Sequence, residues 1–199
     1  LTANTTGGDN VAVGLNALLS NTTGSTNIAI GKDALDSNTT ANNNVAVGVD
    51  CLQTNTTGAS NVAMGRQALE SNTTANNNTG IGYKALTANT TGERLIAVGQ
   101  SALAANTTAS YNVAIGDRAL LTNTGSANNV AVGANALYTF NVASGDGYNV
   151  AVGKNAGFAI TTGTNNTFVG GEAGDSTDNG NANTAVGKAA LSGNCGDYN

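Results

Sequence analysis

The 199-residue chain contains no proline, no histidine and no tryptophan, and only 10% of its residues are charged. Without histidine, neither a Ser-His-Asp triad nor a Cys-His pair can form. The same absence, with only two cysteines, excludes the usual zinc sites. No run of about 18 apolar residues predicts a membrane-spanning helix. Seven Lys and Arg against twelve Asp and Glu provide no basic surface for nucleic acid.

Asn, Thr, Gly and Ala dominate instead, a composition that by itself favours disorder. The spacing of the apolar residues argues against disorder, because a glycine preceded by an apolar residue recurs every 17 residues, with one step of 20. These repeat glycines are Gly14, Gly31, Gly48, Gly65, Gly82, Gly99, Gly116, Gly133, Gly153, Gly170 and Gly187.

The consensus of the repeat is N-V-A-V-G-x-x-A-L-x-x-N-T-T-G-x-x. V-A-V alternates with period 2, as a strand does, and N-T-T-G is typical of a turn. A 17-residue unit fits one solenoid coil with a strand, a glycine turn, a second short strand near A-L and a longer turn. Coils stack about 4.8 Å apart, so eleven coils would give a rod of about 50 Å. We therefore predict an all-β, parallel β-solenoid (β-roll) of about eleven 17-residue coils.

The 20-residue step divides the solenoid into regular coils over residues 1–137, a turn with a three-residue insertion over 138–149, and variant coils over 150–199. Leu1 falls at the leucine position of a coil and Asn199 just before a strand, so we expect the repeat to continue beyond both ends. Two columns of stacked asparagines are predicted, one before the strands, as at Asn27, and one in the opposite turn, as at Asn38.

The middle residue of the strand is small in ten of the eleven copies, with Phe168 as the exception. We expect the flanking valines to face the coil interior and the middle alanines, such as Ala46, to face outward. A solvent-facing strand position normally tolerates polar residues. The small apolar column therefore predicts close contact with a symmetry mate along the rod.

The elements N-I-A-I-G at Asn27–Gly31 and N-V-A-V-G at Asn44–Gly48 resemble the head repeats of trimeric autotransporter adhesins of the YadA type. The segment Thr161–Gly170 is also similar to repeats of phage tail fibres. The resemblance covers the whole chain, although adhesin repeats are usually shorter than 17 residues. It implies a left-handed β-roll that forms a homotrimer along its length and binds host surfaces, and it implies no catalytic residue.

The insertion carries Tyr138, Phe140 and Tyr148, which we predict as a candidate contact loop; the alternative is a local adjustment of the core. Cys51 occupies the alanine position of its coil and is expected to be a buried, inert thiol, too far from Cys195 for a disulfide. The oxygen-rich loop with Asp175 and Asp178 matches no known calcium motif. We predict no catalytic residue, no cofactor and no metal site.

The sequence thus predicts a structural and adhesive segment of an extracellular fibre, at a cell surface or on a virion, and not an enzyme. A host glycan or protein receptor is the expected partner, besides two further copies of the chain. Adhesin and phage fibre remain open. The alternative is a monomeric ligand-binding solenoid such as an ice-binding protein, suggested by threonine pairs such as Thr22-Thr23. The N-x-T sequons, as at Asn21 and Asn165, are explained by turn chemistry without glycans.

Overall fold

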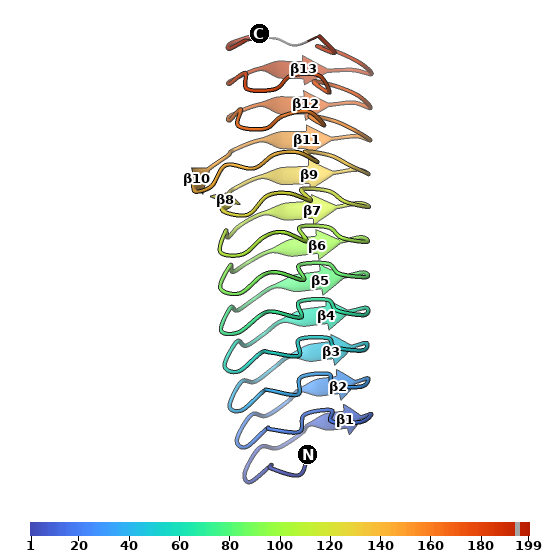
Figure 1. The fold of residues 1–199 in the computed structure, drawn as a ribbon, viewed down its shortest axis with the longest axis vertical. Coiled ribbons are helices and arrows are strands. Elements are labelled where there is room, and N and C mark those ends of the chain that lie inside the picture. Colours follow the sequence, from blue (N-terminus) through green and yellow to red (C-terminus); the bar gives the residue numbers. More distant parts are fainter. Residues whose placement is uncertain (194–195) are drawn as a thin grey trace.

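The computed structural model describes residues 1–193 and 196–199, and these residues form no helix. Eleven three-residue strands stack in chain order into one parallel sheet. Figure 1 shows them one above another along a rod, with the two termini at opposite ends. The predicted all-β parallel solenoid with a 17-residue repeat is confirmed, and the eleven strands bound about ten turns. The strands are β1 (Val11–Val13), β2 (Ile28–Ile30), β3 (Val45–Val47), β4 (Val62–Met64), β5 (Thr79–Ile81), β6 (Ile96–Val98), β7 (Val113–Ile115), β9 (Val130–Val132), β11 (Val150–Val152), β12 (Thr167–Val169) and β13 (Thr184–Val186).

The pairing register sets each residue against its equivalent in the next coil, as Val45 pairs with Val62. The repeat glycine that follows each strand has a positive φ, +139° at Gly31. A Cβ at Gly31 would lie 2.3 Å from the carbonyl oxygen of Gly48 in the next coil. Only glycine permits both this backbone conformation and this close approach, which explains why the residue recurs in every coil.

The Ala-Leu segment is a turn and not the second short strand that we predicted. Its leucines adopt left-handed backbone conformations, with φ of 50° at Leu18 and 55° at Leu86. Such a conformation costs a non-glycine residue roughly 1–2 kcal/mol. Burying a leucine side chain contributes about 1.5–3 kcal/mol, and both side chains are fully buried. The reversed backbone therefore turns each leucine into the interior, and its burial offsets the strain.

The orientation predicted for the strand residues is wrong, because the middle alanine faces inward and the flanking residues face outward. In β2, Ala29 is fully buried, whereas Ile28 and Ile30 are 37% and 39% exposed. The interior beneath the sheet is filled by leucines: even a Cβ added at Gly80 would lie 3.2 Å from Leu69 Cγ. The middle position is small because the coil is narrow inside, and not because another molecule covers it.

The two predicted asparagine ladders are confirmed, and their side chains are buried from Asn21 and Asn27 upward. In the ladder before the strands, Asn44 Oδ1 accepts a hydrogen bond from the backbone N–H of Asn61 at 2.9 Å. In the opposite turn, Asn72 Nδ2 donates to Asn55 Oδ1 at 2.9 Å. The asparagines also donate to turn carbonyl oxygens within the coil, so they satisfy buried backbone groups that the short strands leave unpaired.

The insertion contributes one strand to a small second sheet beside the rod. β8 (Ser126–Ala127) pairs in parallel with β10 (Gly145–Asp146), and this pair projects from the side of the stack in Figure 1. The asparagine ladder of the opposite turn, which we call the turn ladder, ends at the same level. Phe140 and Ile160 take the positions that asparagine holds up to Asn123. Both apolar side chains are fully buried, so the interior becomes more apolar above the insertion.

Candidate interaction surfaces

The described part of the chain contains no pocket or cleft that could enclose a ligand. Across residues 1–193 and 196–199, no three His, Cys, Asp or Glu side chains come together to hold a metal ion. In the same ranges, no helix is long and apolar enough to cross a membrane. Any recognition by the described residues therefore uses the outside of the rod.

The three aromatic residues of the predicted contact loop do not form one site. Phe140 is fully buried and cannot contact a partner, which corrects its assignment to the candidate contact loop and matches the alternative of a core adjustment. Tyr138 is half-buried and stacks on Phe158 with a ring-centroid distance of 5.1 Å. Tyr148 alone projects into solvent, with 54% of its surface exposed.

Tyr148 belongs to a different group of exposed side chains, which we call the tyrosine patch and define as Arg94, Tyr111, Asn128, Asp146 and Tyr148. Arg94, Tyr111, Asn128 and Tyr148 occupy the same repeat position in four successive coils, directly before the ladder position, which Leu95 holds in the first of these coils and asparagine in the others. Tyr111 is 50% exposed. With coils about 4.8 Å apart, the two tyrosines stand roughly 10 Å from each other along the rod.

Hydrogen bonds hold the upper half of the tyrosine patch in place. The hydroxyl of Tyr148 donates to Asp146 Oδ2 at 2.8 Å, and Asn128 Nδ2 donates to Asp146 Oδ1 at 2.7 Å. The hydrogen bond to Asp146 raises the pKa of the Tyr148 hydroxyl. The carboxylate retains free lone pairs that can accept hydrogen bonds from a ligand.

The lower half of the patch is a cation–π pair, in which the guanidinium of Arg94 lies 5.3 Å from the ring centroid of Tyr111 and also donates to its hydroxyl. Tyr111 was not singled out from the sequence. The available signal was its position in the repeat, which it shares with Tyr148.

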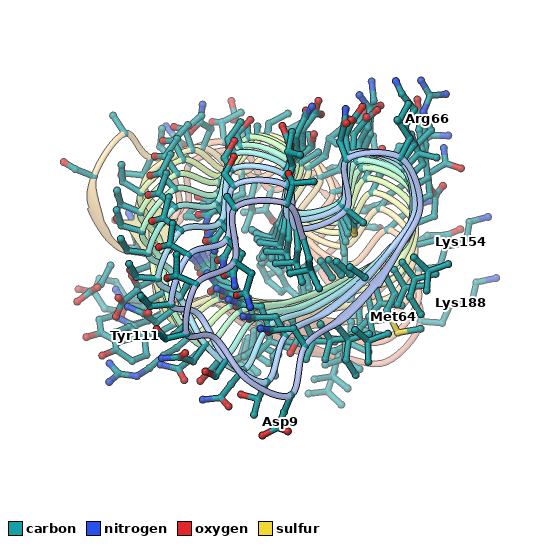
Figure 2. The ribbon with its side chains drawn as sticks, turned by 90° about the horizontal axis from the view of Figure 1, so that it is seen from below. Asp9, Met64, Arg66, Tyr111, Lys154 and Lys188 are labelled. Carbon is teal, nitrogen blue, oxygen red and sulfur yellow. The ribbon has the colours of Figure 1, made fainter. Side chains whose placement is uncertain are left out.

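The largest exposed apolar feature is the outer wall, defined as the first and third residues of the eleven strands of the large sheet. The third position is apolar in every strand, and the first is apolar in all except β5, β12 and β13, which have threonine there. Seen along the rod, Tyr111 lies at one end of this wall and Met64 at the other (Figure 2).

The turns that border the outer wall differ in charge. The glycine edge, defined as the two residues after each repeat glycine, carries six of the seven cations of the chain (Lys32, Arg66, Lys84, Arg118, Lys154 and Lys188) and four acids (Asp33, Asp50, Asp117 and Glu172). The leading edge, defined as the two residues before each ladder position, carries three acids (Asp9, Glu93 and Asp197) and one cation (Arg94), and Asp146 lies against it. One edge is therefore net positive and the other net negative.

Two acidic residues near the lower end of the rod, Asp33 and Asp36, are partly enclosed by the fold. Asp33 accepts a hydrogen bond from Asn16 Nδ2 at 2.8 Å and lies 3.0 Å from Lys32 Nζ, and these contacts lower the pKa of its carboxyl. Burial raises the pKa of Asp36, whose Oδ1 is buried without a hydrogen-bond partner. Neither residue faces a groove where a carboxylate pair could act on a substrate.

Cys51 is fully buried and free, as predicted, and burial raises the pKa of its thiol to about 12. Its predicted distance from Cys195 is not testable, because Cys195 lies outside the described residues. Asp178 accepts a hydrogen bond from Thr161 Oγ1 at 2.5 Å, so the oxygen-rich loop is partly engaged in coil stacking.

Residues of the threonine pairs and of the sequons also form hydrogen bonds between neighbouring coils. The first threonine of a pair donates its hydroxyl to the next coil, as Thr22 Oγ1 does to Thr39 O at 3.0 Å, and only the second, such as Thr23, is fully exposed. The sequon asparagines of the turn ladder, such as Asn38, are buried and donate hydrogen bonds. Asn165 is exposed.

Comparison with known proteins found no matching family model, no similar curated protein and no similar solved structure. The resemblance to adhesin heads and phage fibres therefore rests on the repeat motif alone.

Proposed function

We propose that the chain is a structural and adhesive segment of an extracellular fibre, at a cell surface or on a virion, and not an enzyme. The observation that carries this proposal is the unbroken axial ladder: eleven strands in register, with two buried asparagine columns beside them. In such a stack each coil is stabilised by its neighbours, so a long, stiff rod results from a repeated sequence. A rod of this kind suits the extension of a binding surface away from its anchor.

The proposal includes a homotrimer wound left-handedly, as in the adhesin heads that the motif resembles. The exposed outer wall supports association, since monomeric proteins rarely expose large contiguous apolar patches. The alanine column no longer supports it, because those side chains face the interior. Surface adhesin and phage fibre are equally compatible with these features.

The tyrosine patch is the proposed adhesive surface, and a host glycan or protein is the proposed receptor. Two exposed tyrosine rings about 10 Å apart, with a fixed carboxylate and an amide between them, offer stacking faces and hydrogen-bonding groups together. The patch lies where the rod is widest, beside the projecting β8–β10 pair (Figure 1).

An array of immobilised glycans, probed with the fluorescently labelled chain, tests the adhesive role. The double variant Tyr111→Ala/Tyr148→Ala should lose at least tenfold in apparent affinity for any glycan that the unaltered chain binds. Tyr83→Ala removes a comparably exposed tyrosine from the glycine edge and is the matched control. If the double variant and the control bind equally well, the tyrosine patch is not the adhesive surface. If electron microscopy shows no extended particles, the chain is not a fibre segment.

The alternative of an ice-binding monomer has one supporting observation, the column of exposed second threonines such as Thr23. The hydroxyls of the first threonines are engaged between coils, which leaves a single exposed column and not a paired one. Thermal hysteresis of a monomeric solution would favour this alternative over the fibre.

A further inference from the structure

Every strand of the outer wall carries at least one outward apolar residue, and the wall is bordered by turns of opposite net charge. We infer that it is the contact surface between copies of this chain, packed wall against wall with their rods parallel. This inference deepens the proposed fibre function and rests on it only for the number of copies. It assigns the contact to the outward first and third strand residues.

The extent of the wall fits a partner of similar size. Eleven strands about 4.8 Å apart and three residues wide, at about 3.3 Å per residue, give a surface of about 500 Å². With part of the two bordering edges, this approaches the roughly 800 Å² that each partner buries in a stable protein–protein interface. Residues at both ends of the rod contribute exposed apolar surface, for example Val13 at 57% and Val186 at 71%.

The spacing of the repeat favours a second copy of this chain as the partner that covers the outer wall. Apolar side chains, mostly valine and isoleucine, recur along the wall once per coil, about every 4.8 Å. A partner can pack its side chains between those of all eleven strands only if its own side chains recur at the same spacing. A copy of this chain meets that condition along its entire length, whereas a globular protein or a single peptide strand meets it over a few strands at most.

Charge decides the relative direction of the rods. With two walls facing each other and the rods parallel, the glycine edge of one copy lies against the leading edge of the other. The cations of the first, such as Lys84, then approach the acids of the second, such as Glu93. With the rods antiparallel, each edge meets its own equivalent and like charges face each other, which is unfavourable. A ring of three parallel copies preserves the same pairing of opposite edges.

Two variants with matched charge test the contact surface. Ile81→Lys/Ile115→Lys places two cations on the outer wall, at outward positions that do not pack in the core. Thr74→Lys/Thr108→Lys adds the same charge at the second threonines of the opposite turn and is the control. Light scattering should give a multiple of the 19.5 kDa chain mass for the unaltered protein and the control, and the single-chain mass for the wall variant.

Circular dichroism should show the β-sheet signal of the unaltered chain in both variants. If the wall variant unfolds, the outward alanine substitutions Ile81→Ala/Ile115→Ala replace it, with at least a tenfold rise in the dissociation constant expected. A single-chain mass for the unaltered protein at 100 μM overturns the inference, as does an oligomer that the folded wall variant leaves intact.

Spin labels test the direction of the rods, in a Cys51→Ala/Cys195→Ser background. A label on Thr23→Cys and, in a second preparation, on Thr162→Cys marks exposed turns near opposite ends of the rod. Parallel rods give short distances, within about 30 Å, between equivalent labels in both preparations. Distances near the length of the rod in both would overturn the parallel arrangement. A trimer mass supports the inference and the proposed homotrimer together, while a dimer mass supports the inference and removes the homotrimer.

Discussion

The ring of Phe168 fills the space that a side chain at Gly174 would need. A Cβ added at Gly174 would lie 2.6 Å from Phe168 Cε1, and one at Gly157 in the coil below would lie 3.1 Å from Phe168 Cδ2. These two glycines stand where nine other coils have leucine, with a similar positive φ of 60°. One large residue in the alanine column thus replaces two leucines of the interior, and these three departures from the consensus share one space in the core.

This relationship predicts strong coupling between the three positions. Phe168→Ala alone should leave a cavity and lower the free energy of unfolding by about 3–5 kcal/mol. Gly174→Leu alone should also destabilise, by about 1–3 kcal/mol, because the new side chain overlaps the ring. The triple variant Phe168→Ala/Gly157→Leu/Gly174→Leu restores the consensus interior and should recover most of the loss.

Thermal unfolding followed by circular dichroism measures the coupling. Gly171→Ala is the control, since a Cβ there meets only one atom, at 3.9 Å, and should leave the midpoint nearly unchanged. If the triple variant loses as much free energy of unfolding as the separate substitutions lose together, the three side chains do not compete for one space.

The turn ladder predicts a high cost for removing one buried amide. Asn72 Nδ2 donates to Asn55 Oδ1 and to the carbonyl oxygen of Ala75, and Asn72 Oδ1 accepts from Asn89 Nδ2. Asn72→Ala should cost about 1–3 kcal/mol for each buried partner left unsatisfied. The exposed Thr74→Ala, two residues later, is the control. Chemical denaturation measures both, and an equal effect of the two substitutions would argue against a stabilising ladder.

The partly buried carboxyl of Asp36 predicts that a neutral amide in its place stabilises the fold only at a pH where the carboxyl is ionised. Burial, and then the nearby charge of Asp33, raise the folded-state pKa of Asp36 above its ordinary value of 3.8. The folded state therefore binds a proton more readily than the unfolded state, and stability falls as the pH rises from 3.8 through the folded-state pKa. Asp36→Asn should raise the unfolding midpoint at pH 7 and have little effect at pH 3.

Asp175→Asn is the control for this comparison, because it changes an acid at the same repeat position in another coil. A gain for Asp36→Asn that is as large at pH 3 as at pH 7 would exclude ionisation as its cause.

The buried thiol of Cys51 predicts slow chemical modification. With a pKa of about 12 and no exposed surface, it forms almost no thiolate at pH 8. In a Cys195→Ser background, a thiol reagent such as dithionitrobenzoate should react only after denaturant is added. Cys51→Ala restores the consensus and should change stability by less than about 1.5 kcal/mol. Prompt reaction of the folded protein would show that this coil opens readily.

Much of the fold follows from the repeat period alone. Residues such as Gly31 and Asn44 recur at a constant spacing, and stacking equivalent residues is the arrangement in which a 17-residue period yields continuous hydrogen-bonded columns. The period could not show which side of a three-residue strand faces inward. The alternation V-A-V is symmetric about its centre, so Ala29 and its neighbours Ile28 and Ile30 fit either orientation. The tyrosine patch was missed for a related reason, since Asp146 approaches Asn128 only through the β8–β10 pairing.

The amino-acid sequence alone therefore determined the coil length, the parallel stacking and the asparagine columns, because each is a consequence of a repeated spacing and short-range turn chemistry. Only the tertiary structure decided which surface is apolar. The leucines adopt a left-handed backbone conformation, fill the narrow interior and leave room there for nothing larger than alanine, so the valines and isoleucines face outward. That choice depends on the volume enclosed by one coil, a quantity that no pattern of residues along the chain expresses.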